Sequence, residues 1–285
     1  MYKKKIAILS ILLGFYGAST TSLVASTNVT TGQTDNTSAK KTPKPWKLGL
    51  GSTFESNLEE TSSTDYSLTN TSYGSLKLTL DNGVSVSTSI AIDKDLQNDR
   101  ETTLRDSALS FSKSLHKFNE QLSLAGNLSF AIPLSESSQN ITNLYTSIRV
   151  RPSLSYDASK SMIDGLSFTY LPSLRTYFHQ YETKSTGGSN TRYALSNRLV
   201  VSYSLTDSLG ISFDNTYLRT WTYQGQSKDI YSLDQSIGYS INDNLAATIG
   251  HAIGGSVLAV NGQEQNIDLF NSQTSTIYFD LSLSY

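Results

Sequence analysis

Apolar and polar residues alternate along most of this 285-residue chain, from about residue 46 to its end. Residues 275–285 show the pattern most clearly. Their apolar parity is occupied by Ile277, Phe279, Leu281, Leu283 and Tyr285. A period of two indicates a β-strand with one apolar and one polar face. A water-soluble sandwich and a membrane barrel both use such strands, so the number of repeats has to distinguish them.

Turn residues separate twelve alternating segments, and the pattern therefore predicts twelve strands. We place them at 46–57, 72–80, 84–94, 102–115, 122–134, 143–157, 166–182, 191–205, 209–223, 229–241, 245–259 and 271–285. Most are as long as the roughly 9–11 residues that a tilted strand needs to cross a bilayer, or longer. The segment 97–115 is the least regular, so ten or fourteen strands remain alternatives.

Short and long connections tend to alternate along the chain. The tripeptide Asp81-Asn82-Gly83 is a strong hairpin signal, whereas 58–71 and 260–270 are longer and mostly polar. Tight turns at one end and longer loops at the other are typical of outer-membrane barrels, and an even strand number places both termini in the periplasm. We therefore predict an all-β fold, a closed antiparallel transmembrane β-barrel with short periplasmic turns and longer external loops.

The first 45 residues lack this alternation. Residues 1–26 combine three lysines, a short apolar stretch and a small-residue cleavage site, which predicts a signal peptide. Residues 27–45 are polar and contain no aromatic side chain, so we expect a disordered periplasmic tether before a barrel over 46–285. Together these segments predict an integral protein of the Gram-negative outer membrane.

Composition narrows the alternatives. The net charge of −2 gives no basic footprint for nucleic acid. The absence of cysteine excludes a lipoprotein anchor, a disulfide framework and cysteine-ligated metal sites. A hydrophobic content of 37% is low for a globular core, but a barrel that shows half of each strand to water needs no large apolar interior. A tyrosine-rich soluble sandwich remains the alternative.

Parity assigns the apolar face of each strand to lipid, for example Ile90 and Ile92 on the third strand. Arg219 and His251 fall on that face and fit it poorly. Arg219 lies near the predicted outer rim, where lipopolysaccharide phosphates could receive it. His251 lies near mid-strand, and we expect either a bulge at Gly254-Gly255 or a shifted register there.

The opposite parity points basic and acidic side chains into the lumen near mid-height. Positive charge on one wall and negative charge on the opposite wall would give a transverse field, as in diffusion porins, with a weak anion preference. Twelve tilted strands give a backbone radius of roughly 12 Å, which leaves room for a small hydrated solute. The predicted constriction residues are Arg149, Arg151, Arg175, Arg198, Asp214, Asp234 and Asp280, and the candidate solute contacts are Tyr145, Tyr177, His179 and Tyr181.

This architecture resembles the small monomeric twelve-stranded porins for acidic oligosaccharides, such as oligogalacturonate and sialic acid channels, whose lumen is lined with arginines. Arg149, Arg151, Arg175 and Arg198 carry the resemblance here. Nucleoside-specific channels are similar in strand number, and the inward tyrosines could stack on a base or a sugar. The resemblance implies a passive channel for small hydrophilic, anionic or sugar-like solutes. The alternative is that the same charges pair across the lumen and plug it.

Other functions fit the sequence less well. An outer-membrane phospholipase needs Ser and Asn beside an outward His, and His251 has no such neighbours in the sequence pattern. A protease would combine His179 with Asp93 and Asp106, whose strands lie far apart around the barrel. An adhesin would act through the 58–71 loop, which offers little apolar area. We expect no enzyme activity, no cofactor and no metal site.

The expected partners follow from the predicted location. They are outer-membrane lipids and lipopolysaccharide, small hydrophilic solutes, and the barrel-assembly machinery, which would recognise the C-terminal strand ending at Tyr285.

Overall fold

The computed structural model describes residues 45–285 apart from 64, 98–99, 160, 260–263 and 272–273. It also describes a two-residue strand pair, β1 (Leu9–Ser10) and β2 (Thr30–Thr31). The rest of the predicted signal peptide (1–26) and of the tether (27–45) lies outside the described residues, so both stay predictions.

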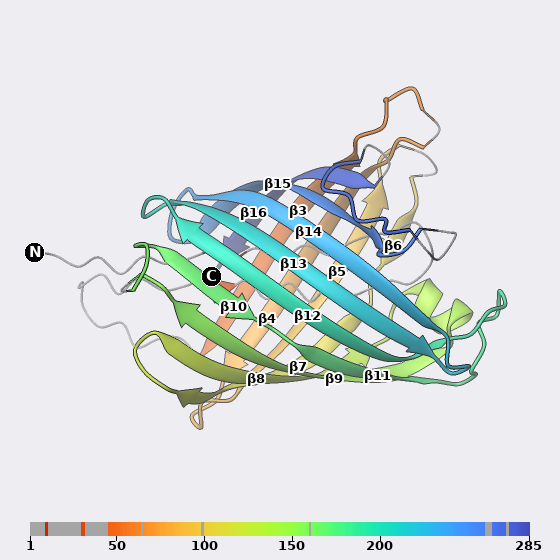
Figure 1. Ribbon diagram of the computed structural model, residues 1–285, viewed down its shortest axis with the longest axis horizontal. Helices are drawn as coiled ribbons and strands as arrows, with labels where there is room; N and C mark the ends of the chain where they lie inside the picture. Colours follow the sequence, from red (N-terminus) through yellow and green to blue (C-terminus); the bar gives the residue numbers. More distant parts are fainter. Residues whose placement is uncertain are drawn as a thin grey trace, which may run out of the picture.

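The described chain from Trp46 onward forms one closed antiparallel barrel (Figure 1). β6 and β7 are two parts of one interrupted strand and occupy a single position in the wall, and the same holds for β10 and β11. The described strands therefore fill the twelve positions predicted from the sequence. The barrel closes where β16 pairs with β3, from Thr276–Asn57 to Ser284–Gly49. The strands are β3 (Trp46–Asn57), β4 (Leu68–Thr79), β5 (Ser85–Asp95), β6 (Thr102–Leu104), β7 (Ser107–Lys117), β8 (Leu122–Ile132), β9 (Leu144–Asp157), β10 (Leu166–Tyr170), β11 (Ser173–His179), β12 (Thr191–Ser204), β13 (Leu209–Thr222), β14 (Ser227–Ser240), β15 (Leu245–Ser256) and β16 (Ser275–Ser284).

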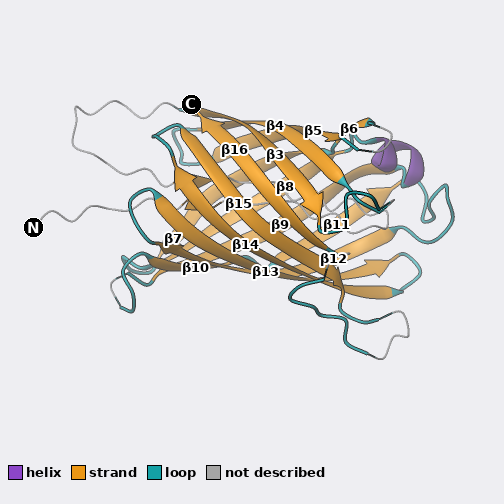
Figure 2. Cartoon of the chain, turned by 90° about the horizontal axis from the view of Figure 1, so that it is seen from above, coloured by secondary structure: helices purple, strands orange, loops and turns teal. Residues whose placement is uncertain are grey.

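The two ends of the barrel differ. Trp46 and Tyr285 lie together at one end, with ring centroids 5.8 Å apart, and we call it the terminal end. The other end, the loop end, carries the longer connections and a one-turn π-helix at Ser137–Ile141 (Figure 2). The predicted hairpin at Asp81-Asn82-Gly83 is confirmed, since Gly83 has φ +78° and the Asn82 side chain accepts the Val84 N–H at 3.0 Å. No helix in the described part of the chain is long and apolar enough to span a membrane.

Several strand boundaries differ from the predicted ones. β4 begins at Leu68 rather than at residue 72 because the Asn57 side chain organises the connection before it. Its amide donates to the Asp65 carbonyl at 2.6 Å, and its oxygen accepts the Ser67 N–H at 2.9 Å. β11 ends at His179 rather than at 182, and β16 begins at Ser275 rather than at 271.

Two predicted single strands, 102–115 and 166–182, are interrupted. In the second, the registers of β9 with β10 and β11 place Pro152 and Pro172 at the same level. Neither proline has an N–H to donate, so the ladder breaks there. In the first, Asp106 turns its carboxylate to the connection after β8, where Oδ1 accepts the N–H groups of Leu134 and Ser135 at 2.9 and 2.8 Å.

The two faces of the wall confirm the predicted parity. The apolar side chains point outward and are largely exposed, as Ile90, Leu128, Leu199 and Phe279 illustrate. The inward parity carries serines, threonines, arginines and aspartates, many of them buried.

The expectation of a bulge or shifted register around His251 was wrong. The pairing of β14 with β15 runs without interruption from Ile230–Ser256 to Ser240–Ala246, and His251 points outward. The chain after β15 folds back over this part of the wall, and the Phe270 ring stacks on the imidazole with centroids 5.8 Å apart. A neighbouring side chain therefore covers the imidazole, and the strand needs no distortion.

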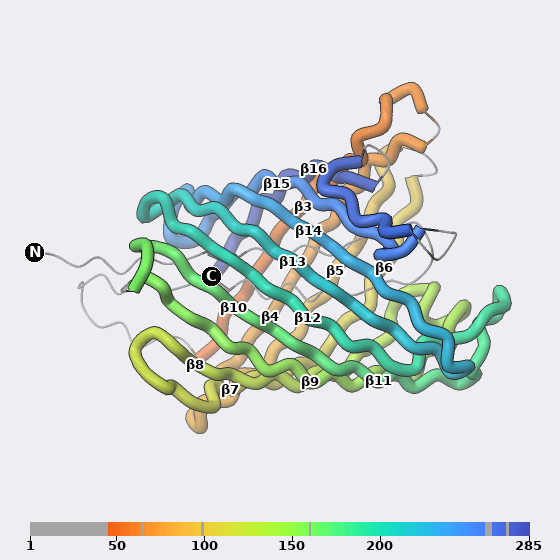
Figure 3. Tube along the Cα trace, in the orientation of Figure 1, coloured from red at the N-terminus to blue at the C-terminus, as the bar shows by residue number. Residues whose placement is uncertain are grey.

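Two inward tyrosines each lie over a glycine on the next strand and reach an aspartate on the strand beyond it. Tyr73 on β4 crosses Gly51 and donates to Asp280 at 3.0 Å. Tyr278 on β16 crosses Gly250 and donates to Asp234 at 3.0 Å. These contacts, which we call the tyrosine–aspartate belt, hold both rings against the inner wall. The belt runs from β4 across the closing seam to β14, over strands that follow one another around the barrel (Figure 3).

We predict that Gly51→Ala and Gly250→Ala each lower the free energy of unfolding by about 1–3 kcal/mol, the usual cost of overpacking. A Cβ at either position would lie 2.2 Å from the Cζ of the covering tyrosine, so the ring must move and the bond to its aspartate is lost. Urea unfolding followed by tryptophan fluorescence measures the change. Gly74→Ala is the matched control, because its Cβ meets Leu50 at an ordinary 3.5 Å. Equal stability of all three variants would contradict the role of the belt.

Candidate functional site

Three arginines gather on the inner wall of β9 and β11. Arg149 and Arg175 are direct cross-strand partners, and Arg151 follows Arg149 by two residues toward the terminal end. Arg149 and Arg151 are each only 9% exposed. Like charges directly opposite each other are destabilising, so this arrangement favours a negatively charged group nearby.

Neutral hydroxyl groups accept hydrogen bonds from two of these arginines. Arg149 Nε donates to Ser129 Oγ at 3.2 Å. Arg175 donates to the Tyr177 hydroxyl at 3.3 Å, and its guanidinium lies 5.5 Å from the centre of that ring. Within the described residues, neither Arg151 nor Arg175 forms an ion pair with a carboxylate.

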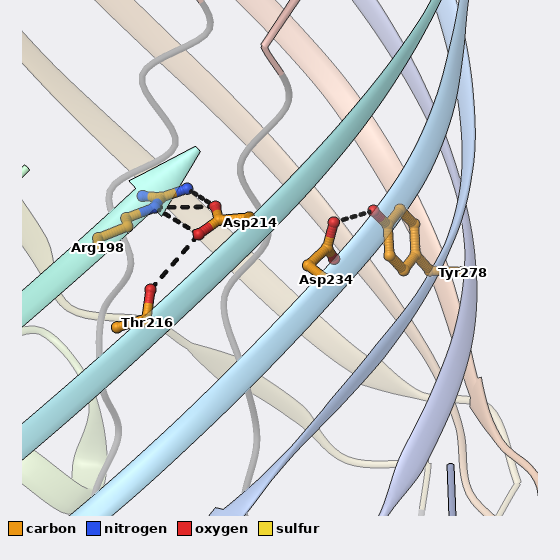
Figure 4. Close-up of polar contacts among 5 residues, drawn as sticks. All are labelled: Arg198, Asp214, Thr216, Asp234 and Tyr278. Atoms are coloured by element: carbon orange, nitrogen blue, oxygen red, sulfur yellow. Dashed lines mark hydrogen bonds and ion pairs between the residues drawn. The ribbon is translucent and has the colours of Figure 1, made fainter. Parts of the chain in front are cut away.

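The fourth predicted arginine is neutralised. Arg198 Nε donates to both carboxylate oxygens of Asp214, at 3.0 and 2.8 Å, and Nη2 contacts the same carboxylate (Figure 4). Both side chains are 13% exposed. Since the pair joins neighbouring strands β12 and β13, it lies along the wall and leaves the lumen uncrossed.

The remaining two predicted acids belong to the belt. Asp234 lies directly opposite Asp214 on β14, and Figure 4 shows it turned toward Tyr278. Asp280 accepts hydrogen bonds from Thr53 at 2.7 Å and from Tyr73. Asp214 on β13 and Asp234 on β14 lie two and three positions from β11 around the wall. Asp280 on β16 lies six positions from β9, on the far side of the barrel.

Two lysines face each other at the terminal end. Lys47 on β3 and Lys77 on β4 are cross-strand partners and line a cavity of ≈ 160 Å³ together with serine hydroxyls. The lining includes Ser110 on β7 and Ser240 on β14, which lie six positions apart in the wall. Because residues from opposite strands border it, this cavity is part of the lumen.

The candidate solute contacts divide into two groups. Tyr177 and His179 stack with ring centroids 6.0 Å apart, whereas Tyr145 and Tyr181 are exposed at the loop end and make no ring contact with them in the described chain. Sequence reasoning missed Tyr223, whose ring meets His179 edge-on at 5.8 Å and whose hydroxyl donates to the Tyr177 carbonyl. Tyr223 is the last residue of the predicted strand 209–223, where parity places it outward with Arg219 and Trp221. β13 ends at Thr222, so the alternation does not extend to Tyr223.

Sequence reasoning also missed a polar cluster on the opposite wall at the loop end. Arg105 donates to Asp93 at 2.6 Å and to Thr71 at 2.9 Å. Asp93 and Asp106, the acids considered for a protease, are therefore engaged near their own strands and not at His179. No three metal-ligating side chains gather among the described residues.

Comparisons with known proteins support the fold. No family model matches the chain, and no curated protein does either. Among solved structures, it is similar to the COG4313 outer membrane channel from Pseudomonas putida F1, with a TM-score of 0.54, 9% identity, and coverage of 89% of this chain and 100% of that one. It is also similar to the NanC porin, with a TM-score of 0.52, 11% identity, and coverage of 84% and 98%. The architecture is thus that of small outer-membrane porins and channels.

We predict that Asp214→Asn lowers the free energy of unfolding by about 1–3 kcal/mol, because it leaves the buried Arg198 guanidinium without its anionic partner. Urea unfolding in detergent measures the effect. Asp229→Asn is the matched control, since Asp229 pairs with Arg219 on the outer wall at 2.6 Å in an exposed setting, where ion pairs contribute little. A similar loss of stability in both variants would show that burial of the Arg198–Asp214 pair is irrelevant.

Proposed function

We propose that this protein is a passive outer-membrane channel for small hydrophilic solutes, with a preference for anions. One observation carries the proposal: the polar contacts described above join strands that are adjacent or one strand apart. Arg198–Asp214, Arg105–Asp93, Tyr73–Asp280 and Tyr278–Asp234 all follow this rule. A plugged barrel would instead pair its charges across the lumen.

The location follows from the outward face. Exposed aliphatic and aromatic side chains cover the wall between the two ends, as a hydrocarbon environment requires. We infer that the terminal end, where Trp46 and Tyr285 lie, faces the periplasm and that the loop end faces outward. Lipids and lipopolysaccharide are then its surroundings, and β16 with Tyr285 is the strand that the assembly machinery would recognise.

The anion preference rests on a simple count. Arg198 and Asp214 cancel, which leaves Arg151 and Arg175, neither of which forms an ion pair with a carboxylate in the described part of the chain, along one wall. The two belt acids, Asp234 and Asp280, oppose them, and Lys47 and Lys77 add positive charge at the periplasmic mouth. Rings of charged side chains set the selectivity of pores, so the surplus favours anions weakly. Tyr177, His179 and Tyr223 would offer ring surfaces to a solute on the way in.

The alternative is a structural or adhesin-type barrel without transport. The low exposure of Arg149 and Arg151 favours it, because a tightly filled lumen would bury these side chains in the same way.

The first prediction separates these functions. The folded barrel, reconstituted in a planar bilayer, should give discrete single-channel currents. A folded, heat-modifiable barrel that inserts but carries no current would make it a plugged anchor.

The second prediction concerns selectivity. Replacing Arg149 and Arg151 together with glutamate should turn the anion preference into a cation preference, because four units of charge change on one strand of the lumen wall. The reversal potential in a salt gradient measures the sign. Arg219→Gln, on the outer wall, is the control and should leave it unchanged. An unaltered reversal potential in the folded double variant would exclude these arginines from the conduction path.

A further inference from the structure

We propose that residues 266–271, which we call the outer flap, lie within the outer leaflet and contact lipid acyl chains. The inference rests on the proposed membrane location. External loops of a barrel ordinarily extend into water or fold into the lumen, so a loop laid against the lipid-facing wall is a distinct feature.

The flap covers part of the outer wall. Tyr231, Leu233 and Ile253 have the outward parity of β14 and β15, yet they are only 7%, 5% and 0% exposed. They form a small apolar cluster with Val257. In Figure 3 the described part of the connection after β15 lies beside β14 and β15 at the loop end.

Hydrogen bonds fix the flap to this wall. The Tyr231 hydroxyl accepts the Asp268 N–H at 2.9 Å and lies 3.4 Å from the Asp268 carbonyl. Asn266 N–H donates to the Val257 carbonyl at 2.8 Å. Asn271 N–H donates to Ser275 Oγ at 3.1 Å, at the start of β16. The backbone at both ends of the flap is therefore anchored to the wall.

The flap also hides a polar group. Phe270 stacks on His251, and the imidazole Nε2 is buried with no hydrogen-bond partner among the residues that the structure describes. An imidazole exposed to hydrocarbon would be costly. Covering it with an aromatic ring makes this part of the wall compatible with lipid.

Three apolar side chains of the flap are exposed. Leu269 and Phe270 are 71% and 69% exposed, and Ile267 is exposed as well. This surface continues directly into the bare wall of β15 and β16, where Ile249, Ile277 and Phe279 are exposed. These apolar side chains of the flap therefore extend the lipid-facing surface of β15 and β16.

The height of the flap agrees with this position. Ile277, the cross-strand partner of His251, precedes Tyr285 by eight residues. At the rise and tilt of barrel strands this is roughly 20 Å above the aromatic residues of the terminal end, inside an apolar band about 25 Å tall. Phe270 thus lies below the outer boundary of the band.

Fluorescence quenching by brominated lipids tests the proposal. Trp46→Phe and Trp221→Phe remove the native tryptophans, and Phe270→Trp then places one reporter on the flap. In vesicles of brominated phosphatidylcholine, it should lose as much emission as a reporter at Phe279→Trp on the bare wall. Tyr181→Trp, in an exposed loop, is the unquenched control.

The outcomes distinguish the flap from the function. Quenching at position 279 but not at 270 would overturn the flap proposal and leave the channel intact. No quenching at 279 would instead overturn the membrane assignment. A Leu269→Cys variant that forms a disulfide-linked dimer in vesicles would show that a second copy covers the flap, which also contradicts lipid contact.

Discussion

The hydrogen-bonded seam between β16 and β3 is the constraint on which the rest of this structure depends. Only a closed ring of strands separates an inner face from an outer face. Because side chains alternate along each strand, every strand residue then faces either the lumen or the surroundings of the barrel. Closure also determines which strands are neighbours around the wall. The arginines on β9 and β11 lie together because these two strands are neighbours in the closed wall.

The belt of Tyr73, Tyr278 and their aspartates shows how the lumen stays organised without a core. Each ring needs a glycine beneath it and an acid beyond it, so three successive strands must carry the right residue at the right level. The hydroxyl groups of Tyr278 and Tyr73 thereby hold Asp234 and Asp280 against the wall. Arg151 and Arg175, which form no ion pair with a carboxylate among the described residues, then face the lumen near mid-height.

Much of this could be predicted from alternation alone: the twelve strands, the two faces and the Asn-Gly hairpin. The sequence shows Pro152 and Pro172, but the interruption between β10 and β11 could not be predicted from it. Only the strand register shows that the two prolines lie opposite each other. The pairing of Arg198 with Asp214 likewise follows from strand adjacency, which the expectation of opposite walls overlooked. The outer flap could not be predicted, because its anchor joins Tyr231 to Asp268 across a connection with no periodic pattern. Asn57, which shifts the start of β4, acts through a side-chain bond that alternation does not detect.

The central claim is an open, positively charged lumen, and chemical modification tests it most directly. A cysteine introduced at Ser173, inward on β11 two residues from Arg175, can be treated with a negatively charged and a positively charged thiosulfonate of similar size. The account predicts that both reagents reach the thiol and that the negative one reacts faster. Failure of both reagents to react with the folded protein, or faster reaction of the positive one, would contradict it.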